Sequence, residues 1–232
     1  MDFTSFRLLA AGSDLAMEPA ARDDADGIEL RMDFAAEPLA QLDAYDGDLP
    51  ILVTNRVAWE GGEAPDTADR LDALVRAVEY DAVAAVDLEL AALTGAADHD
   101  AGRVAAHARD HGVAVVVSTH DFESTPDREA IAERLRRACE HGDVGKMAST
   151  ADSPDDVLAM LSATRELTAA GERVATMCMG EAGRHSRVVA PLYGSKIGYA
   201  PVDPAAATAP GQYDLATLRS LVEQLESDPQ RS

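Results

Sequence analysis

Short apolar runs alternate along the chain with segments whose apolar residues repeat at helical spacing. Runs of this length, bounded by polar and turn-forming residues, are typical of strands buried on both faces. They predict β-strands at Phe6–Ala11, Ile28–Phe34, Ile51–Val57, Ala84–Leu90, Val113–His120, Val144–Ser149, Val174–Met179 and Val188–Tyr193.

Amphipathic helices are predicted between the runs and after the last one. Their clearest stretches are residues 66–80, 126–141, 154–170 and 214–226. In the first of these, the positions i, i+3, i+4 and i+7 form one apolar face, made by Leu71, Leu74, Val75 and Val78. Ser153 is a typical N-cap before a proline at the first helical position, Pro154, and Gly171 is a typical helix end.

The alternation of strands and helices predicts parallel strands joined by crossover helices. Eight strands in 232 residues suit a (β/α)8 TIM barrel that forms a single catalytic domain over residues 1–232. We expect the tail from about residue 227 to be frayed. A doubly wound open sheet is the competing architecture, and the lack of a Gly-rich phosphate loop after an early strand weakens its nucleotide-binding version.

Charged residues interrupt the predicted strands on one face. Glu29, Arg31 and Asp33 alternate with Leu30 and Met32, and alternate residues of a strand share a face. If the apolar face packs under the helices, the charged face points into the barrel, where isolated charges are costly. These charges must therefore pair with one another or with a ligand.

Further polar residues occupy other strands or their ends. Asp87 and Glu89 repeat the alternation, Arg56 and His120 come at strand ends, and Lys146 lies inside an apolar run. Taken singly, each has a structural explanation, such as an inner ion pair or a hydrogen-bonded histidine, and we expect Asp87 to be mainly structural. Taken together, they exceed what a small barrel needs, and they fall toward the carboxyl-terminal face, where active sites of this fold lie.

Three residues late in the chain have the chemistry of substrate ligands. The planar guanidinium of Arg187 suits bidentate binding of a carboxylate. Thr208 and Gln212 flank an Ala-Pro-Gly sequence and offer neutral hydrogen bonds to hydroxyl groups or to a carboxylate. Considered alone, that sequence is simply a turn.

The use of basic residues singles out Lys146. The chain contains eighteen arginines and only two lysines, Lys146 and Lys196. An amine can lose its proton and act as a nucleophile, which a guanidinium cannot do, so Lys146 suggests imine chemistry. Cys139 and Cys178 have no metal-binding spacing, and we expect neither a metal nor another cofactor.

Acidic residues dominate the charge. The chain has 42 acidic and 20 basic residues, for a net charge of −22 that is spread along its length. Such a charge argues against nucleic acid and anionic membrane as partners. Together with the scarcity of lysine, it predicts a protein of a halophile's cytoplasm. The amino terminus has no basic segment followed by an apolar run, and no apolar stretch of about 18 residues occurs, so we expect neither a signal peptide nor a transmembrane helix.

In combination, these residues resemble the type I 3-dehydroquinate dehydratases, the Schiff-base enzymes of the shikimate pathway. The resemblance extends from about residue 28 to residue 213, and the order and spacing of its markers make it specific. The markers are Glu29–Asp33, Thr54–Arg56, Glu60–Gly62, Asp87–Leu90, Ser118–Phe122, Asp143–Lys146, Met179–Gly180, Ser186–Arg187, Gly194–Ser195 and Ala209–Gln212. Family members often have serine where this chain has Thr208, which keeps the hydroxyl.

The resemblance implies a mechanism and a role for each residue. Lys146 would form an imine with the C3 ketone of 3-dehydroquinate. His120, held in position by Glu89, would remove the C2 proton and then protonate the departing C1 hydroxyl in a syn elimination that gives 3-dehydroshikimate. Contacts to the substrate would come from Glu29, Arg31, Arg56, Arg187, Thr208 and Gln212. The family also implies a homodimer and no cofactor.

Two other functions remain open from the residues alone. A class I aldolase on the same barrel would also use a strand lysine, although sugar-phosphate aldolases need a phosphate site that we do not find. A non-catalytic acidic binding protein would use the barrel as a scaffold and would need no nucleophilic lysine.

Overall fold

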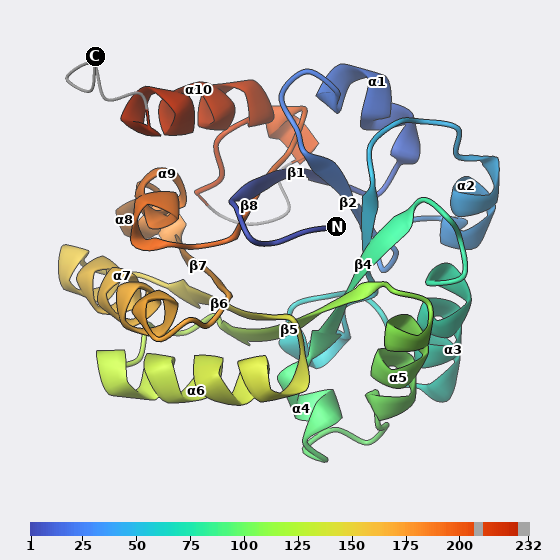
Figure 1. Cartoon of the computed structure of the whole chain (residues 1–232), viewed down its shortest axis with the longest axis horizontal. Coiled ribbons are helices and arrows are strands. Elements are labelled where there is room, and N and C mark those ends of the chain that lie inside the picture. Colours follow the sequence, from blue (N-terminus) through green and yellow to red (C-terminus); the bar gives the residue numbers. More distant parts are fainter. Residues whose placement is uncertain (207–210, 227–232) are drawn as a thin grey trace.

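A nearly closed barrel of parallel strands, surrounded by helices, forms the centre of the molecule (Figure 1). The computed structural model describes residues 1–206 and 211–226, so the predicted frayed tail from residue 227 lies outside the described residues. Within these ranges the strands are β1 (Arg7–Gly12), β2 (Gly27–Arg31), β3 (Ile51–Thr54), β4 (Val83–Glu89), β5 (Ala114–Asp121), β6 (Val144–Thr150), β7 (Val174–Met179) and β8 (Ile197–Ala200).

The strand order follows the sequence around the barrel. Neighbours pair in the order β7-β6-β5-β4-β3-β2-β1-β8, and every pair is parallel. Between β7 and β8, the amide of Lys196 donates to the carbonyl of Val174 at 2.8 Å, and the amide of Thr176 donates to Ser195 Oγ at 3.0 Å. A doubly wound sheet would reverse its order at a central strand. The structure therefore confirms the predicted (β/α)8 TIM barrel.

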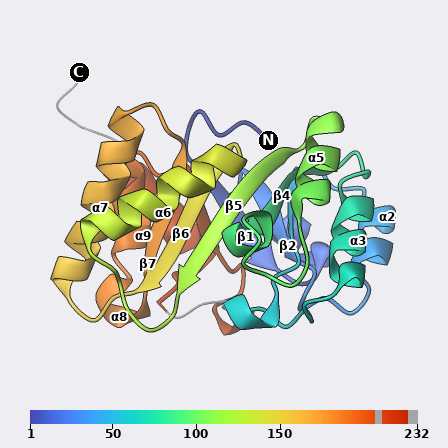
Figure 2. The same cartoon turned by 90° about the horizontal axis from the view of Figure 1, so that it is seen from below.

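Helices cover the outside of the barrel (Figures 1 and 2). The described α-helices are α1 (Glu18–Ala21), α2 (Pro38–Ala44), α3 (Ala68–Ala77), α4 (Leu90–Leu93), α5 (Gly102–Asp110), α6 (Arg128–His141), α7 (Pro154–Ala169), α8 (Gly180–Gly183), α9 (Ser186–Val189) and α10 (Leu215–Glu226). Short 3-10 helices are η1 (Leu15–Met17), η2 (Ala58–Glu60), η3 (Ala190–Tyr193) and η4 (Pro204–Ala206). None of the helices in the described ranges combines the length and the apolar character needed to cross a membrane.

The four predicted helices are confirmed as α3, α6, α7 and α10, with ends shifted by at most a few residues. At α7 the predicted cap is present in full. Ser153 Oγ accepts from the amide of Asp156, whose carboxylate accepts from the amide of Ser153. This reciprocal pair satisfies two amides that the first helical turn would otherwise leave without a partner.

The prediction of a strand at Val188–Tyr193 is wrong. These residues belong to α9 and η3, and β8 follows only at Ile197. Pro191 has no amide hydrogen to donate, which disfavours it in a central strand, whereas it is well tolerated near the start of a helical turn. The chain leaves η3 through Gly194, whose φ of 102° lies in the left-handed region, before it enters the barrel.

The alternation of side chains in each strand separates two apolar layers. On β5, Val115 and Val117 pack outward against the helices, whereas Val116 belongs to the cluster inside the barrel. On β6, Val144 and Ala148 also belong to the inner cluster. Residues two positions apart share a face, so the polar residues near the carboxyl ends of the strands point into the barrel.

Candidate active site

A pocket opens at the carboxyl ends of the strands and brings together most of the predicted site residues. It is lined by Glu29, Arg31, Thr54, Arg56, Glu60, Gly61, His120, Phe122, Lys146, Ala148, Met177, Met179, Arg187, Tyr199 and Gln212. Of the predicted residues, Glu89 is buried outside this lining, and Thr208 lies outside the described residues.

Lys146 lies at the bottom of this pocket among polar partners. It is on the inner face of β6, and its side chain is only 7% exposed. Its Nζ is 3.4 Å from His120 Nε2 and 3.3 Å from Ser118 Oγ. Its counter-ion is Asp87, with Oδ2 at 3.4 Å. The amine is thus within reach of an imidazole and has one buried carboxylate beside it.

His120, near the end of β5, is held between a carboxylate and an aromatic ring. Its Nδ1 is 2.9 Å from Glu60 Oε1, and its ring lies parallel to that of Phe122, with centroids 5.7 Å apart. Burial, followed by the positive charge of Lys146, lowers the pKa of His120 well below its usual range. A neutral imidazole that donates from Nδ1 to Glu60 presents the lone pair of Nε2 to Lys146.

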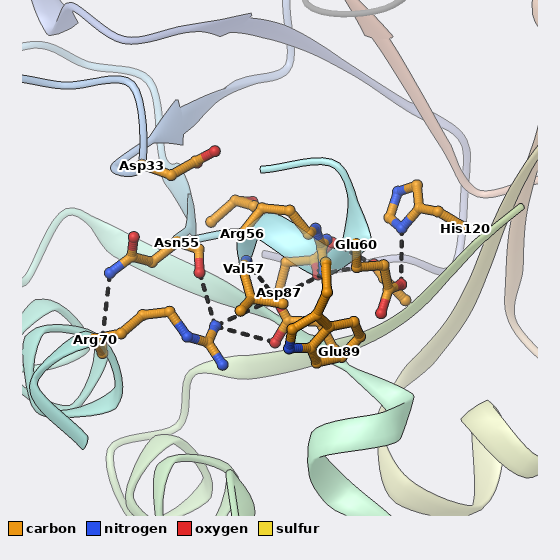
Figure 3. A network of polar contacts seen from close by, with 12 residues as sticks. Asp33, Asn55, Arg56, Val57, Glu60, Arg70, Asp87, Glu89 and His120 are labelled. Atoms are coloured by element: carbon orange, nitrogen blue, oxygen red, sulfur yellow. Dashed lines mark hydrogen bonds and ion pairs between the residues drawn. The ribbon is translucent and has the colours of Figure 1, made fainter. Parts of the chain in front are cut away.

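The carboxylate beside His120 is therefore Glu60, which corrects the expectation that Glu89 holds the imidazole (Figure 3). Glu89 instead makes ion pairs with Arg70 and Arg56, both at 3.1 Å, and accepts from the amide of Val57 at 3.2 Å. Two guanidinium groups and a backbone amide thus hold Glu89 in place. Its role in this arrangement is to position Arg56 and the start of the loop after β3.

The strand patterns of the sequence do not indicate Glu60, although its side chain lies beside His120. It lies on η2, the short helix after β3, where no strand or long-helix pattern marks it. Burial, despite the opposing charge of Arg56, raises its pKa to about 7. A sequence signal does exist in the two glycines that follow. A Cβ on Gly62 would lie 1.9 Å from the carbonyl oxygen of Arg56, so the loop that places Glu60 needs glycine there.

A buried charge network supports the floor of the pocket (Figure 3). Arg56 Nη2 donates to Asp87 Oδ1 at 2.5 Å, and Ser118 Oγ lies 2.6 and 2.7 Å from the two oxygens of Asp87. Burial alone would raise the pKa of Asp87, but the charges of Arg56 and Lys146 outweigh it and lower the pKa. Asp87 thus remains an anion beside Lys146. We expected a mainly structural role for Asp87, but its carboxylate contacts Lys146 directly.

Charged groups from other strands surround the opening. Glu29 Oε1 accepts from Thr54 Oγ1 at 2.8 Å. Arg31 is fixed by two hydrogen bonds to Asp33, at 2.9 and 2.6 Å. These bonds restrict the rotamers of Glu29 and Arg31, so the groups are held in place before any ligand binds.

Arg187 is carried by α9, the element that replaces the expected eighth strand. The amide of Cys178, on β7, donates to Ser186 Oγ at 2.8 Å and so ties α9 to the barrel. Arg187 is 5% exposed, and burial lowers its pKa to about 10, which still leaves it cationic at neutral pH. A buried cation at the pocket wall is suited to an anionic ligand.

Gln212 reaches the pocket from the chain before α10. It follows Gly211, which has a φ of 77°, and a Cβ on that glycine would lie 2.5 Å from the carbonyl oxygen of Gly180. Gly211 therefore packs directly on the backbone at the start of α8, which brings the next residue to the pocket wall.

Comparison with known proteins identifies the family. The family model described as Type I 3-dehydroquinase matches residues 11–229. A 3-dehydroquinate dehydratase of Haloarcula marismortui is 82% identical over 98% of this chain and 100% of its own length. The one of Halobacterium salinarum is 51% identical over 97% of this chain and 100% of its own length.

Solved structures agree with this result. The 3-dehydroquinate dehydratase of Geobacillus kaustophilus has a TM-score of 0.86 at 28% identity, covering 98% of this chain and 93% of that one. The type I enzyme of Clostridium difficile with covalently modified comenic acid has a TM-score of 0.81 at 29% identity, covering 95% of this chain and 92% of that one. The chain therefore belongs to the type I 3-dehydroquinase family.

Proposed function

We propose that this chain is a hydro-lyase that removes water from 3-dehydroquinate to give 3-dehydroshikimate in the shikimate pathway. The observation that carries the proposal is the 3.4 Å separation between Lys146 Nζ and His120 Nε2, with Glu60 on the other ring nitrogen. A nucleophilic amine and a proton carrier are thus adjacent in one pocket. The names of the curated relatives support the same reaction.

The first step is imine formation. The neutral amine of Lys146 attacks the C3 ketone, a C–N bond forms, and the carbonyl oxygen leaves as water. The protonated imine then withdraws electrons from the neighbouring C2–H bond. Lysine suits this step because a guanidinium in its place could not form the imine. The structure of the Clostridium difficile relative contains covalently modified comenic acid, which is in line with the proposed covalent chemistry.

The second step is the elimination. His120 Nε2 takes the C2 proton, and Glu60 stabilises the imidazolium through Nδ1. The same nitrogen then gives its proton to the C1 hydroxyl, which leaves as water from the same side of the ring. A further water hydrolyses the imine, which releases 3-dehydroshikimate and restores the amine of Lys146. The buried, pKa-lowered imidazole is suited to accepting the first proton.

Substrate binding is assigned to the charged walls of the pocket. Arg187 pairs with the substrate carboxylate, while Glu29, Arg31, Arg56 and Gln212 contact the carboxylate or the ring hydroxyls. Thr208 keeps the role that its hydroxyl suggests, as a proposal that rests on sequence alone. No step of this mechanism requires a metal or another cofactor.

Borohydride trapping tests the imine. After incubation with 3-dehydroquinate and reduction, digestion and mass spectrometry should find the adduct on Lys146. The chain offers a matched control, because its only other lysine is Lys196, whose Nζ donates to Thr4 O away from the pocket. Lys196→Met should keep turnover and the adduct, whereas Lys146→Met should lose both while substrate still binds in part. An adduct-free enzyme with normal turnover would remove the mechanism.

The same experiment separates the other two candidate functions. An aldolase would form the adduct but would cleave a carbon–carbon bond, and a binding protein would form no adduct. His120→Ala should still trap the imine but should slow elimination by several orders of magnitude. Wild-type rates in His120→Ala would remove the proposed base.

We further propose that the chain works as one catalytic domain, as a homodimer, in the cytoplasm. Two free cysteines, Cys139 and Cys178, suit a reducing compartment. The apolar stripe of α10 does not supply the dimer contact by itself, because Leu215, Leu218 and Val222 are buried against the barrel. Light scattering during size-exclusion chromatography would contradict the dimer if it gave the mass of one chain.

A further inference from the structure

A cluster of three metal-binding side chains lies at the end of the barrel opposite the pocket. Glu79 precedes β4, and His107 and His111 precede β5, so all three lie near the amino-terminal ends of the strands. Among the described residues, Glu79, His107 and His111 each offer one ligand atom, and these atoms lie within 4.8 Å of one another. They come from neighbouring helical segments, the end of α3 and the end of α5 (Figure 1).

The contacts within this cluster already bring two ligands together. His107 Nε2 is 3.1 Å from Glu79 Oε1. His107 and His111 are four residues apart on one helical face, and their ring centroids are 4.2 Å apart. Two imidazoles and a carboxylate therefore share a small region of the surface.

The third ligand is oriented by the backbone. His111 Nδ1 lies 2.9 Å from the carbonyl oxygen of His107. In the neutral ring this bond places the hydrogen on Nδ1 and leaves the lone pair on Nε2. Histidines that bind metals are commonly held in this way, with the second ring nitrogen donating to a carbonyl or a carboxylate. A surface ion pair would explain why Glu79 and His107 lie together, but it would not explain why His111 is held beside them.

We propose that Glu79, His107 and His111 bind a divalent transition-metal ion of the Zn²⁺ type. Two imidazoles and one carboxylate suit zinc, whereas Mg²⁺ and Ca²⁺ prefer shells of oxygen ligands. Ligand atoms around tetrahedral zinc lie about 3.3 Å apart, given bonds of about 2.0 Å. Glu79 and His111 are exposed and His107 is half-buried, so small side-chain rotations reach that spacing and leave the fourth position to water.

Metal binding at this site links two helices without touching the pocket. The ion joins the segment after α3 to α5, and it binds the folded chain better than the unfolded one, where Glu79 is far from the two histidines. Zn²⁺ should therefore raise the melting temperature, and at about 100 times its Kd the rise should be about 5 °C or more. Turnover should not change, so this proposal can fail independently of the proposed function.

Isothermal titration of the full chain with ZnCl₂ in excess Mg²⁺ measures the site. We expect saturable binding of one ion per chain, and His107→Ala, His111→Ala and Glu79→Gln should each weaken it at least tenfold. His141→Ala is the matched control, because His141 also ends a helix, α6, and lies near Cys139 in sequence. That variant should bind Zn²⁺ as the wild type does.

Co²⁺ gives an independent readout through its visible absorption, which is intense for a four-coordinate site. The wild type should show that absorption and His111→Ala should lose it, with dehydratase activity intact in both. The proposal is overturned if no saturable binding survives excess Mg²⁺, or if His141→Ala loses binding as the cluster variants do.

Discussion

Glu60 and His120 are joined by one hydrogen bond, and their pKa values are displaced in opposite directions. Burial raises the pKa of Glu60 to about 7 and lowers the pKa of His120 well below its usual range. When Glu60 is ionised, it accepts from Nδ1 and leaves Nε2 free to take a proton. Once Glu60 is protonated, it donates to Nδ1, and the hydrogen of the ring moves to Nε2. The protonation state of Glu60 therefore determines which ring nitrogen of His120 can accept a proton.

Replacing this carboxylate should change both the rate and its pH dependence. In the wild type, kcat/KM should fall as the pH drops through about 7, because Glu60 gains a proton there. Glu60→Gln should lower kcat by about 10²–10⁴-fold. It should also move the acid limb to lower pH, because the remaining group, His120, becomes protonated only well below its usual pKa. Steady-state rates from pH 5 to pH 9 measure both effects.

A neighbouring carboxylate provides the control for this change. Glu63 is exposed on the same loop, three residues later, and Glu63→Gln should keep the rate and the pH profile of the wild type. An acid limb that stays in place in Glu60→Gln would show that another group controls the base.

At this scale, the sequence could identify most of the site but not the partner of His120. Lys146 and His120 are recognisable because polar residues are unusual inside or at the end of apolar strands. Glu60 and Glu89 are both acidic residues near a strand end, and their pattern alone does not separate them. Arg70, from α3, pairs with Glu89 together with Arg56, and Glu60 meets His120 across 60 positions of sequence. Both contacts depend on the folded chain.

Among the elements near the site, the short loop from β3 through η2 packs against its own backbone. The amide of Gly62 donates to Val57 O at 3.0 Å, and the amide of Ala64 donates to Arg56 O at 3.1 Å. These bonds fold the loop back onto the end of β3. Arg56 lies at the start of the loop, and Glu60, further along it, faces His120. The loop therefore acts as a unit that places two charged residues of the pocket.

A methyl group at Gly62 should disturb this unit. Its Cβ would lie 1.9 Å from the carbonyl oxygen and 2.4 Å from the carbonyl carbon of Arg56, which are backbone atoms that cannot rotate away. Gly62→Ala should destabilise the fold by about 1–3 kcal/mol, as overpacking does, and lower kcat/KM at least tenfold because Glu60 moves. Thermal unfolding and steady-state kinetics measure the two effects.

Gly102→Ala tests whether this effect is specific to the loop. The nearest atom to its Cβ, Asp100 Oδ1 at 3.0 Å, is at the end of a flexible side chain, and the position starts α5. Alanine should therefore be tolerated or slightly stabilising there. Equal losses in the two variants would contradict the proposed role of the Arg56–Gly62 contact.

Some of the predicted elements depend on adjacent residues alone, whereas others depend on contacts between distant parts of the chain. The start of α7 follows from adjacent residues, since Ser153 and Asp156 form the cap between themselves, and it was predictable. The eighth strand was misplaced because Val188–Tyr193 and Ile197–Ala200 are both short apolar runs. The second run is selected by its parallel pairing with β1 and by the bonds of Ser195 and Lys196 to β7, which depend on the closed barrel. Pro191 was the available sign that the first run is helical.

Over the whole molecule, the excess negative charge lies on the surface and hardly in the core. The 42 acidic side chains exceed the 20 basic ones, and two of the buried carboxylates near the pocket, Asp87 and Glu89, have arginine partners. The excess of negative charge therefore lies mainly on the outside, where like charges repel across the folded chain. Unfolding separates those charges, so the repulsion favours the unfolded state.

Salt should therefore stabilise the fold. At about 1 M salt the Debye length falls to about 3 Å, compared with about 10 Å at 0.1 M, so repulsion between surface carboxylates is largely screened. We expect the melting temperature to rise steadily with KCl, as measured by circular dichroism, and the fold to loosen at low salt. The scarcity of lysine in the chain is consistent with an adaptation to such conditions but does not itself produce the dependence.

A variant with fewer surface charges distinguishes the screening of charge repulsion from a general effect of salt on the burial of apolar groups. Asp23, Asp98 and Glu123 are exposed, and changing them together to Asn, Asn and Gln removes three negative charges with little change of shape. If repulsion controls stability, this variant should melt higher than the wild type at low KCl, and its melting temperature should depend less steeply on KCl. A parallel shift of both curves at all salt concentrations would point instead to strengthened burial of apolar groups, because that contribution does not depend on the number of surface charges.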